Sequence, residues 1–317
     1  MAKKTTKPKI SFFQVLGITG KILGSIISII FMLFFLMLII GFFGLFMGGE
    51  IETGNVALIQ INGLITATGT DSMMQNGVKS DDIVSLIEKA EENKKIKAIL
   101  FEINSGGGSP VASDEISEAI KKAEKPTVAL IREAGASGAF WIATSADKVY
   151  ANRMSVTGSI GVTSAGLTFE DFIEQYNITY RRLTIGEYKD TGSIWRGMTQ
   201  QEKTITLERM QKIQEEFIKA IAENRNLDFE FVEKYADGSI FLGNEAKEAG
   251  FIDELGNKQD VKKYLKEKLG EDITFRKYKT SKGLAEILSG VITEQSMNVG
   301  RGLGDKLLQE DNTKVLV

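Results

Sequence analysis

Short apolar runs and longer amphipathic stretches alternate along the chain between residues 55 and 277. The short runs are rich in Val, Ile, Leu and Phe, which is typical of buried strands. They predict strands at 55–61, 97–103, 127–131, 148–151 and 273–277. Apolar positions at helical spacing predict helices at 81–92, 111–124, 139–146, 199–224, 229–235, 244–249 and 258–269. This alternation favours an α/β fold with mostly parallel strands.

One apolar segment is much longer than the predicted strands. Residues 22–49 carry no charge and consist mainly of Ile, Leu, Phe and Met. A helix of this length, rising about 1.5 Å per residue, exceeds the hydrocarbon core of a bilayer, which is roughly 30 Å thick. The segment is also too long for a signal-peptide core, and no small-x-small cleavage pattern follows it. We predict a retained transmembrane anchor rather than a buried core helix.

The charges on either side of this segment predict its orientation. Lysines precede it at positions 3, 4, 7, 9 and 21, whereas Glu50 and Glu52 follow it and the next basic residue is Lys79. The positive-inside rule predicts a single-pass protein of the cell membrane with a cytoplasmic N-terminus. The predicted organisation is a basic cytoplasmic tail at 1–21, the anchor at 22–49, an extracytoplasmic domain at 50–280 and a C-terminal tail at 281–317.

Two residue types are missing from the 317-residue chain, cysteine and histidine. Without cysteine there are no disulfides and no thiolate metal sites. Without histidine the Ser-His-Asp triad, the Cys-His dyad and most zinc enzymes are excluded. The net charge of −3 gives no indication of a nucleic-acid partner. We predict no metal site and no cofactor.

Two loops of small residues, 104–108 and 135–138, follow predicted strands. In a parallel α/β sheet such loops meet at the carboxyl edge, where ligands bind. Ser137, between Ala136 and Gly138, would open a helix whose free N–H groups favour a developing oxyanion. Taken alone these loops are weak signals, because glycine after a strand is usually a turn and serine at a helix start is usually a cap.

A series of further motifs spans residues 55–257. They are INSGGG at 103–108, ASGAFWIA at 136–143, DKVYA at 147–151, TGSIGV at 157–162, GEYKD at 186–190, ADGSIF at 236–241 and DELG at 253–256. This ordered set resembles the signal peptide peptidase A family, and its first loop is similar to that of Clp-type proteases. The resemblance implies a crotonase/Clp-protease-like spiral of β-β-α units after the transmembrane helix. It also implies a homo-oligomeric, membrane-bound serine endopeptidase whose substrates are signal peptide remnants.

The same resemblance implies a Ser–Lys dyad. Ser137 would be the nucleophile and Lys189 the general base, with Ser159 orienting the lysine. The backbone N–H groups of Gly108 and Gly138 would form the oxyanion hole. The substrate groove would be lined by Asn104, Ser105, Gly106 and Gly107.

A lysine base makes a physical demand on its surroundings. The pKa of free lysine is about 10.4. Burial or nearby positive charge must lower it toward about 7–8 for the amine to act as a base. We therefore expect an apolar wall around Lys189, and we expect the neighbouring Glu187 and Asp190 to point elsewhere.

Some points stay open at this stage. Gly106 and Ile194 stand where the family usually has proline, which leaves the groove shape and cleavage preference undetermined. A broader quality-control protease for misfolded membrane or exported proteins fits the same motifs. A non-catalytic scaffold and an acyl-CoA enzyme on a crotonase-type fold are alternatives of a different class, although neither requires both Ser137 and Lys189.

Overall fold

The computed structural model describes residues 12–47, 53–68 and 77–279. They fall into two units, which divide after residue 53 and are considered separately. The first unit contains helix α1, Phe12–Met47. Its stretch Leu23–Gly41 is long and apolar enough to cross a membrane. The predicted C-terminal tail and the first four of the flanking lysines lie outside the described residues.

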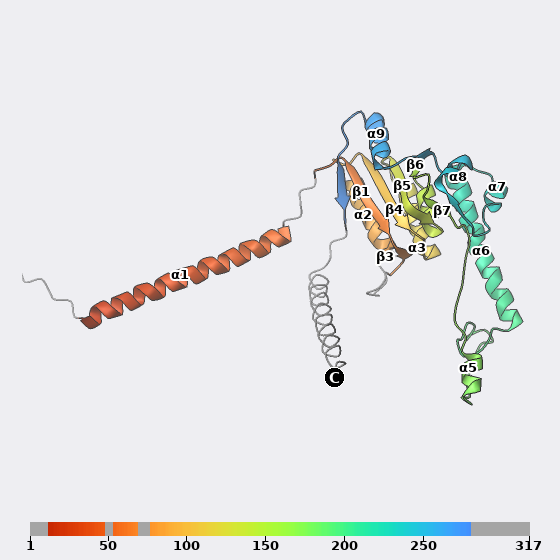
Figure 1. Cartoon of the computed structure of the whole chain (residues 1–317), viewed down its shortest axis with the longest axis horizontal. Coiled ribbons are helices and arrows are strands. Elements are labelled where there is room, and N and C mark those ends of the chain that lie inside the picture. The colour runs from red at the N-terminus through yellow and green to blue at the C-terminus, as the bar shows by residue number, and fades with distance from the viewer. Residues whose placement is uncertain (1–11, 48–52, 69–76, 280–317) are drawn as a thin grey trace, which may run out of the picture. The chain divides into compact units, whose positions relative to one another are not determined.

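The second unit is built around a sheet whose strands are mostly parallel (Figure 1). The strands are β1 Val56–Asn62, β2 Leu64–Thr66, β3 Gly77–Lys79, β4 Ala98–Ser105, β5 Thr127–Ala136, β6 Lys148–Ala151, β7 Val156–Gly158, β8 Ile240–Leu242, β9 Glu254–Leu255 and β10 Phe275–Tyr278. The helices are α2 Ser80–Glu92, α3 Pro110–Lys121, α4 Gly138–Thr144, α5 Glu170–Gln175, α6 Gln200–Arg225, α7 Phe229–Glu233, α8 Gly243–Glu248 and α9 Lys258–Leu269.

The main path of the sheet has the strand order β10-β1-β4-β5-β6-β9, with parallel pairing throughout. The short β7 pairs in parallel with the end of β5, and β8 pairs antiparallel with β7. Strands β2 and β3 form a separate parallel pair. Every predicted strand and helix is present, which confirms the α/β class. The short strands β2, β3, β7, β8 and β9 and the helix α5 were not predicted.

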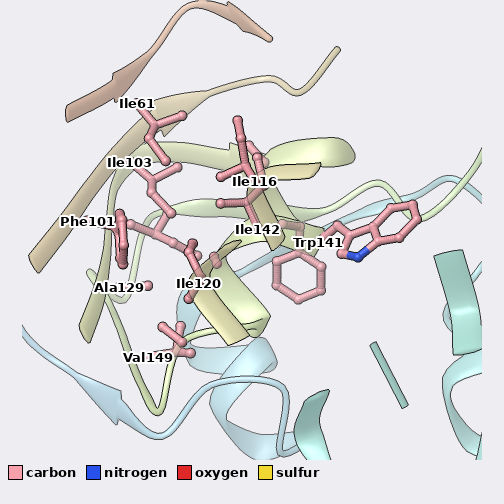
Figure 2. Close-up of a cluster of buried hydrophobic side chains, with 14 of the residues drawn as sticks. Ile61, Phe101, Ile103, Ile116, Ile120, Ala129, Trp141, Ile142 and Val149 are labelled. Atoms are coloured by element: carbon pink, nitrogen blue, oxygen red, sulfur yellow. The ribbon is translucent and has the colours of Figure 1, made fainter. Parts of the chain in front are cut away.

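Both faces of the sheet are buried. Helices α2, α3 and α4 pack on one face, where Phe101 and Ile103 of β4 join the larger hydrophobic cluster (Figure 2). Helix α9 packs on the other face, where Leu100 and Leu130 join a smaller cluster. Strands that are covered on both sides read as nearly continuous apolar runs, which is why the hydrophobic pattern located them.

After β7 the chain leaves the sheet and returns only through helix α6. We call residues 164–199 the arm. Figure 1 shows its helix α5 beside the N-terminal end of α6, away from the sheet. Helix α6 buries Phe217, Ile218 and Ile221 in its C-terminal half, where it contacts α4 and α7. The arm therefore extends from the part of α6 that has little contact with the core.

Candidate active site

Ser137 occupies a sharp turn between β5 and α4. Its backbone has φ 53° and ψ −129°, a conformation that costs energy for any residue with a side chain. The Ser137 N–H donates to the Gly158 carbonyl at 2.7 Å, and the Ser137 carbonyl accepts from the Phe140 N–H at 2.8 Å. Among the described residues, the Ser137 hydroxyl has no hydrogen-bond partner. The fold thus holds a half-buried serine in a strained turn with its hydroxyl free to react.

Two glycine N–H groups lie beside this turn. A Cβ placed on Gly107 would lie 2.8 Å from both the Ser137 Cβ and the Gly138 nitrogen, and a Cβ placed on Gly138 would lie 3.4 Å from the Gly108 nitrogen. Within the described part of the chain, neither the Gly108 nor the Gly138 N–H donates to another protein group. A reactive serine next to two free backbone donors is the arrangement that stabilises a tetrahedral oxyanion.

The loop after β4 is shaped by its own side chains. The Asn104 Oδ1 accepts from the Ala134 N–H at 3.1 Å, at the point where the β4–β5 register shifts. The Ser105 hydroxyl donates to the Gly63 carbonyl at 2.6 Å and accepts from the Gly107 N–H at 3.0 Å. Because these side chains are occupied, Asn104 and Ser105 would contact a substrate through their backbone. Their predicted place in the groove, with exposed Gly106 and buried Gly107, stays a prediction.

A cavity of about 110 Å³ adjoins Ser137. It is lined by Gly108, Pro110, Ser137, Gly138, Trp141, Gly161, Val162, Thr163, Ile213 and Phe217. The Trp141 and Phe217 rings stack with their centroids 5.1 Å apart and form part of the wall. A second cavity of about 450 Å³ shares Pro110, Trp141 and Ile213 with the first and continues between α3 and α6. None of the residues that line the first cavity is ionisable, so it suits a small apolar side chain.

Ser159 lies next to the nucleophile turn. It follows β7, whose Gly158 pairs with Ala136. Ser159 is half-buried, has φ 52°, and its N–H donates to the Ser239 carbonyl at 2.8 Å. The structure thus brings the segment of Ser159 against that of Ser137 through strand pairing.

Lys189 lies apart from this group. It is exposed in a turn of the arm, and its N–H donates to the Gly186 carbonyl at 3.2 Å. It does not line the cavity at Ser137. In the described residues its amine has no hydrogen bond and no ion pair. Within one chain, Ser137 and Lys189 therefore do not line the same cavity. The apolar wall expected around Lys189 is not found either, because Lys189 is exposed.

The carboxylate that follows Lys189 points elsewhere, as a lysine base requires. The Asp190 carboxylate binds Arg196 through two nitrogens and Arg182 at 2.6 Å. Hydrogen bonds from Arg196, together with the charges of both arginines, hold the pKa of Asp190 below its ordinary value. At neutral pH the Asp190 carboxylate is therefore ionised and bound to the two arginines.

The sequence did not single out Glu102, a buried carboxylate close to the site. It lies in β4, two residues before Asn104, and binds Arg132 of β5 at 2.5 Å, Gln60 at 2.9 Å and Lys258 at 3.4 Å. Burial alone would raise the pKa of Glu102, but these partners together hold it below its ordinary value. Glu102 thus fixes β5 five residues before Ser137. The sequence feature that could have indicated it is a single Glu within the apolar run at 97–103.

No group of three or more His, Cys, Asp or Glu residues in the described part of the chain could hold a metal ion. A cavity of about 740 Å³ lies between α2 and α3 and is lined mainly by carboxylates such as Glu88, Glu91 and Glu118. It shares no lining residue with the cavity at Ser137.

Comparison with known proteins bears directly on this site. Residues 119–271, which include Ser137 and Lys189, match peptidase family S49. A protein of Enterococcus faecium that carries the name signal peptide peptidase SppA is 31% identical over 229 residues, which cover 71% of this chain and 67% of that protein. A protein of Methanocaldococcus jannaschii named as a protease is 30% identical over 229 residues, covering 71% and 72%. Protease 4 of Haemophilus influenzae is 28% identical over 205 residues, which are 64% of this chain and 33% of that protein.

The family match includes the serine turn and the arm, and the relatives are named as peptidases or proteases and not as acyl-CoA enzymes. The chain therefore belongs to the signal peptide peptidase A family, peptidase family S49, and is a serine peptidase.

Proposed function

We propose that this chain is a membrane-bound endopeptidase that degrades cleaved signal peptides through a Ser137–Lys189 dyad. The observation that carries the proposal is the strained Ser137 turn, whose free hydroxyl lies beside two free N–H groups and an apolar cavity. Helix α1 would anchor the chain, with the catalytic domain outside the cytoplasm as the flanking charges favour. The strands and helices of the domain would follow the crotonase-like spiral of the family.

The reaction would be acyl transfer through Ser137. Neutral Lys189 takes the hydroxyl proton as the Ser137 oxygen attacks the scissile carbonyl carbon. The Gly108 and Gly138 N–H groups bind the oxyanion. The C–N bond then breaks, and the lysine ammonium returns the proton to the leaving amine. Water, deprotonated by Lys189, hydrolyses the acyl-enzyme and regenerates Ser137.

A second copy of the chain would complete the site. The arm exposes large apolar side chains that a monomer rarely leaves in water, among them Leu183 at 98% and Ile185 at 100% exposure. A ring of copies in head-to-tail contact would cover them and bring Lys189 of one copy to the Ser137 cavity of the next. That cavity has no ionisable lining, so burial there would favour the neutral amine that catalysis needs.

Complementation between inactive variants tests both parts of the proposal. The full chain in detergent would be assayed on a short apolar fluorogenic peptide, as wild type, Ser137→Ala and Lys189→Ala. Each variant alone should be inactive. Co-assembly of the two in equal amounts should restore about a quarter of the wild-type activity, because one site in four receives both intact residues in a head-to-tail ring.

Two results would contradict the proposal in different ways. Activity in Lys189→Ala alone removes the lysine from the mechanism. If Ser137→Ala and Lys189→Ala assemble together but the mixture stays inactive, both residues of a working site must come from the same chain. Lys203→Ala is the matched control, since Lys203 is another exposed lysine near the arm and should leave the activity unchanged.

A further inference from the structure

A compact charge cluster lies next to Lys189 in the arm. The Arg196 Nε and Nη2 donate to the two Asp190 carboxylate oxygens at 3.0 and 2.9 Å. Its Nη1 and Nη2 donate to the two Glu202 oxygens at 2.8 and 2.5 Å, and Nη1 also donates to the Gly197 carbonyl at 3.0 Å. Arg196 thus engages all five donors of its planar guanidinium, and both carboxylates are held in bidentate contacts.

This cluster is shielded although the rest of the arm is open. The side chains of Glu202, Asp190 and Arg196 are 3%, 14% and 15% exposed. Glu202 also caps helix α6, where it accepts from the Thr199 N–H at 2.8 Å. The hydrogen bonds from Arg196, followed by that from Thr199, hold the pKa of Glu202 far below its ordinary value. The three side chains therefore remain charged, and their ion pairs remain formed, near neutral pH.

The position of Asp190 gives the cluster a consequence for catalysis. Asp190 directly follows Lys189 in the chain. A free carboxylate within about 4–6 Å of an amine favours the ammonium form, which cannot accept a proton. In the structure both Asp190 oxygens face Arg196, and Arg182 contacts one of them as well. Two arginines therefore bind the carboxylate that is next to Lys189 in the chain.

We propose that Arg196 is a positioning residue that withholds Asp190 from Lys189 and so leaves the lysine amine free to act as the base. This inference rests on the proposed function, because it gives Lys189 the role of general base. Arg196 itself touches neither the nucleophile turn nor the cavity beside it. It acts through Asp190, and it fixes the turn that carries Lys189 to the first turn of α6 through Glu202.

Three other carboxylates lie close to the turn in the chain or in neighbouring elements. Glu187 is the second carboxylate beside Lys189 in the chain, and burial together with the Glu187 charge raises the pKa of the neighbouring Tyr188. Glu170 of α5 accepts from the Gly197 N–H at 2.7 Å. Glu202 of α6 is occupied by Arg196, and the cavity at Ser137 is lined by uncharged residues. Without Arg196, Glu202 keeps its hydrogen bonds from the Thr199 N–H and the Thr191 hydroxyl, whereas Asp190 keeps only Arg182.

The pH dependence of the rate separates this role from a merely structural one. Arg196→Gln keeps a polar side chain but leaves Asp190 with Arg182 alone, so part of its charge is free for Lys189. We expect the midpoint of the rising limb of kcat/KM against pH to move up by about one unit, with a roughly tenfold lower rate below that limb. The double variant Arg196→Gln/Asp190→Asn lacks the released carboxylate, so its midpoint should return to that of wild type.

The comparison would use the full chain across pH 6–10, with unfolding temperatures measured in parallel. Arg209→Gln, an exposed arginine elsewhere on α6, is the matched control and should leave the midpoint in place. If Arg196→Gln fails to fold, Arg182→Gln removes the other arginine from Asp190 and should shift the midpoint in the same direction by a smaller amount.

Two outcomes would overturn the inference. If the Arg196→Gln enzyme is slower by the same factor at every pH, Arg196 has only a structural role. A shifted midpoint that Asp190→Asn does not reverse would have another cause. Either result leaves the dyad intact as long as Lys189→Ala is inactive, whereas an active Lys189→Ala enzyme rejects the dyad itself.

Discussion

The two halves of the proposed site are held by different forces. The Ser137 turn leads into α4, whose Phe140 is fully buried and makes edge-to-face contacts with Phe241 and Phe251 at 5.6 and 5.8 Å. The arm that carries Lys189 leaves Leu183 and Ile185 almost completely exposed. Its order comes from the Arg196 charge cluster and from a small aromatic cluster, in which Phe169 contacts Phe172 and Trp195. The geometry of the nucleophile turn is thus fixed by the core of the domain, whereas the conformation of the arm depends on a few local contacts.

A substitution in the core beneath the Ser137 turn should have the largest effect on the free energy of unfolding. Phe101 is fully buried between the sheet and its helices (Figure 2). We expect Phe101→Ala to lower the free energy of unfolding by about 3–5 kcal/mol, through lost burial and a new cavity. Leu183→Ala in the arm should change it by less than about 0.5 kcal/mol. Urea unfolding of both variants measures the contrast, and equal losses would contradict it.

A change at the nucleophile turn should cost activity with a smaller cost in stability. A Cβ on Gly138 would lie 2.2 Å from the Ser113 Oγ, so Gly138→Ala must shift the turn and its N–H group. Loss of one oxyanion donor typically lowers kcat about 100- to 1,000-fold. Peptide cleavage by the folded variant measures this. Adding Ser113→Ala removes the closest clash and should recover part of the rate; a fully active Gly138→Ala enzyme would exclude this N–H from the oxyanion hole.

A polar change on the arm should have the smallest effect on the folded chain. In Leu183→Ser/Ile185→Ser two fully exposed apolar side chains are replaced, so circular dichroism should be unchanged. If another copy covers them, the apparent molecular mass in detergent should fall, and cleavage should fall with it. Light scattering coupled to gel filtration measures the mass. Unchanged mass and activity would mean that this surface of the arm is not an interface.

The sheet was predictable because its strands are buried on both faces. Residues 148–151 were predicted as a strand with the bounds that β6 has. Strand β5, in contrast, continues from the predicted end at residue 131 to Ala136 through polar Arg132 and Glu133. Its extension depends on pairing with β7 and on the bond from Ala134 to Asn104. Such tertiary pairing overrides a local pattern, which is also why strands of two or three residues escaped prediction.

The candidate site divides in the same way. Ser137, Gly108 and Gly138 follow strands whose order could be inferred, so their meeting at one edge of the sheet was predictable. The role given to Lys189 came from the resemblance alone, since no apolar periodicity fixes the arm. The link from Arg196 to both Asp190 and Glu202 was not predicted, because a spacing of six residues in a loop has no regular geometry that would bring the side chains together.

The pairing of β1 with β10 affects how the domain is made in the cell. Asn55 beside β1 exchanges hydrogen bonds with Thr274 and Asp272 beside β10, across up to 219 residues of chain. At about 5–20 residues per second, synthesis of that stretch takes roughly 10–40 s. During this interval the outer edge of β1 has no partner, and an open strand edge invites pairing with other chains. The nascent domain is therefore expected to be most prone to aggregation in the interval before β10 emerges.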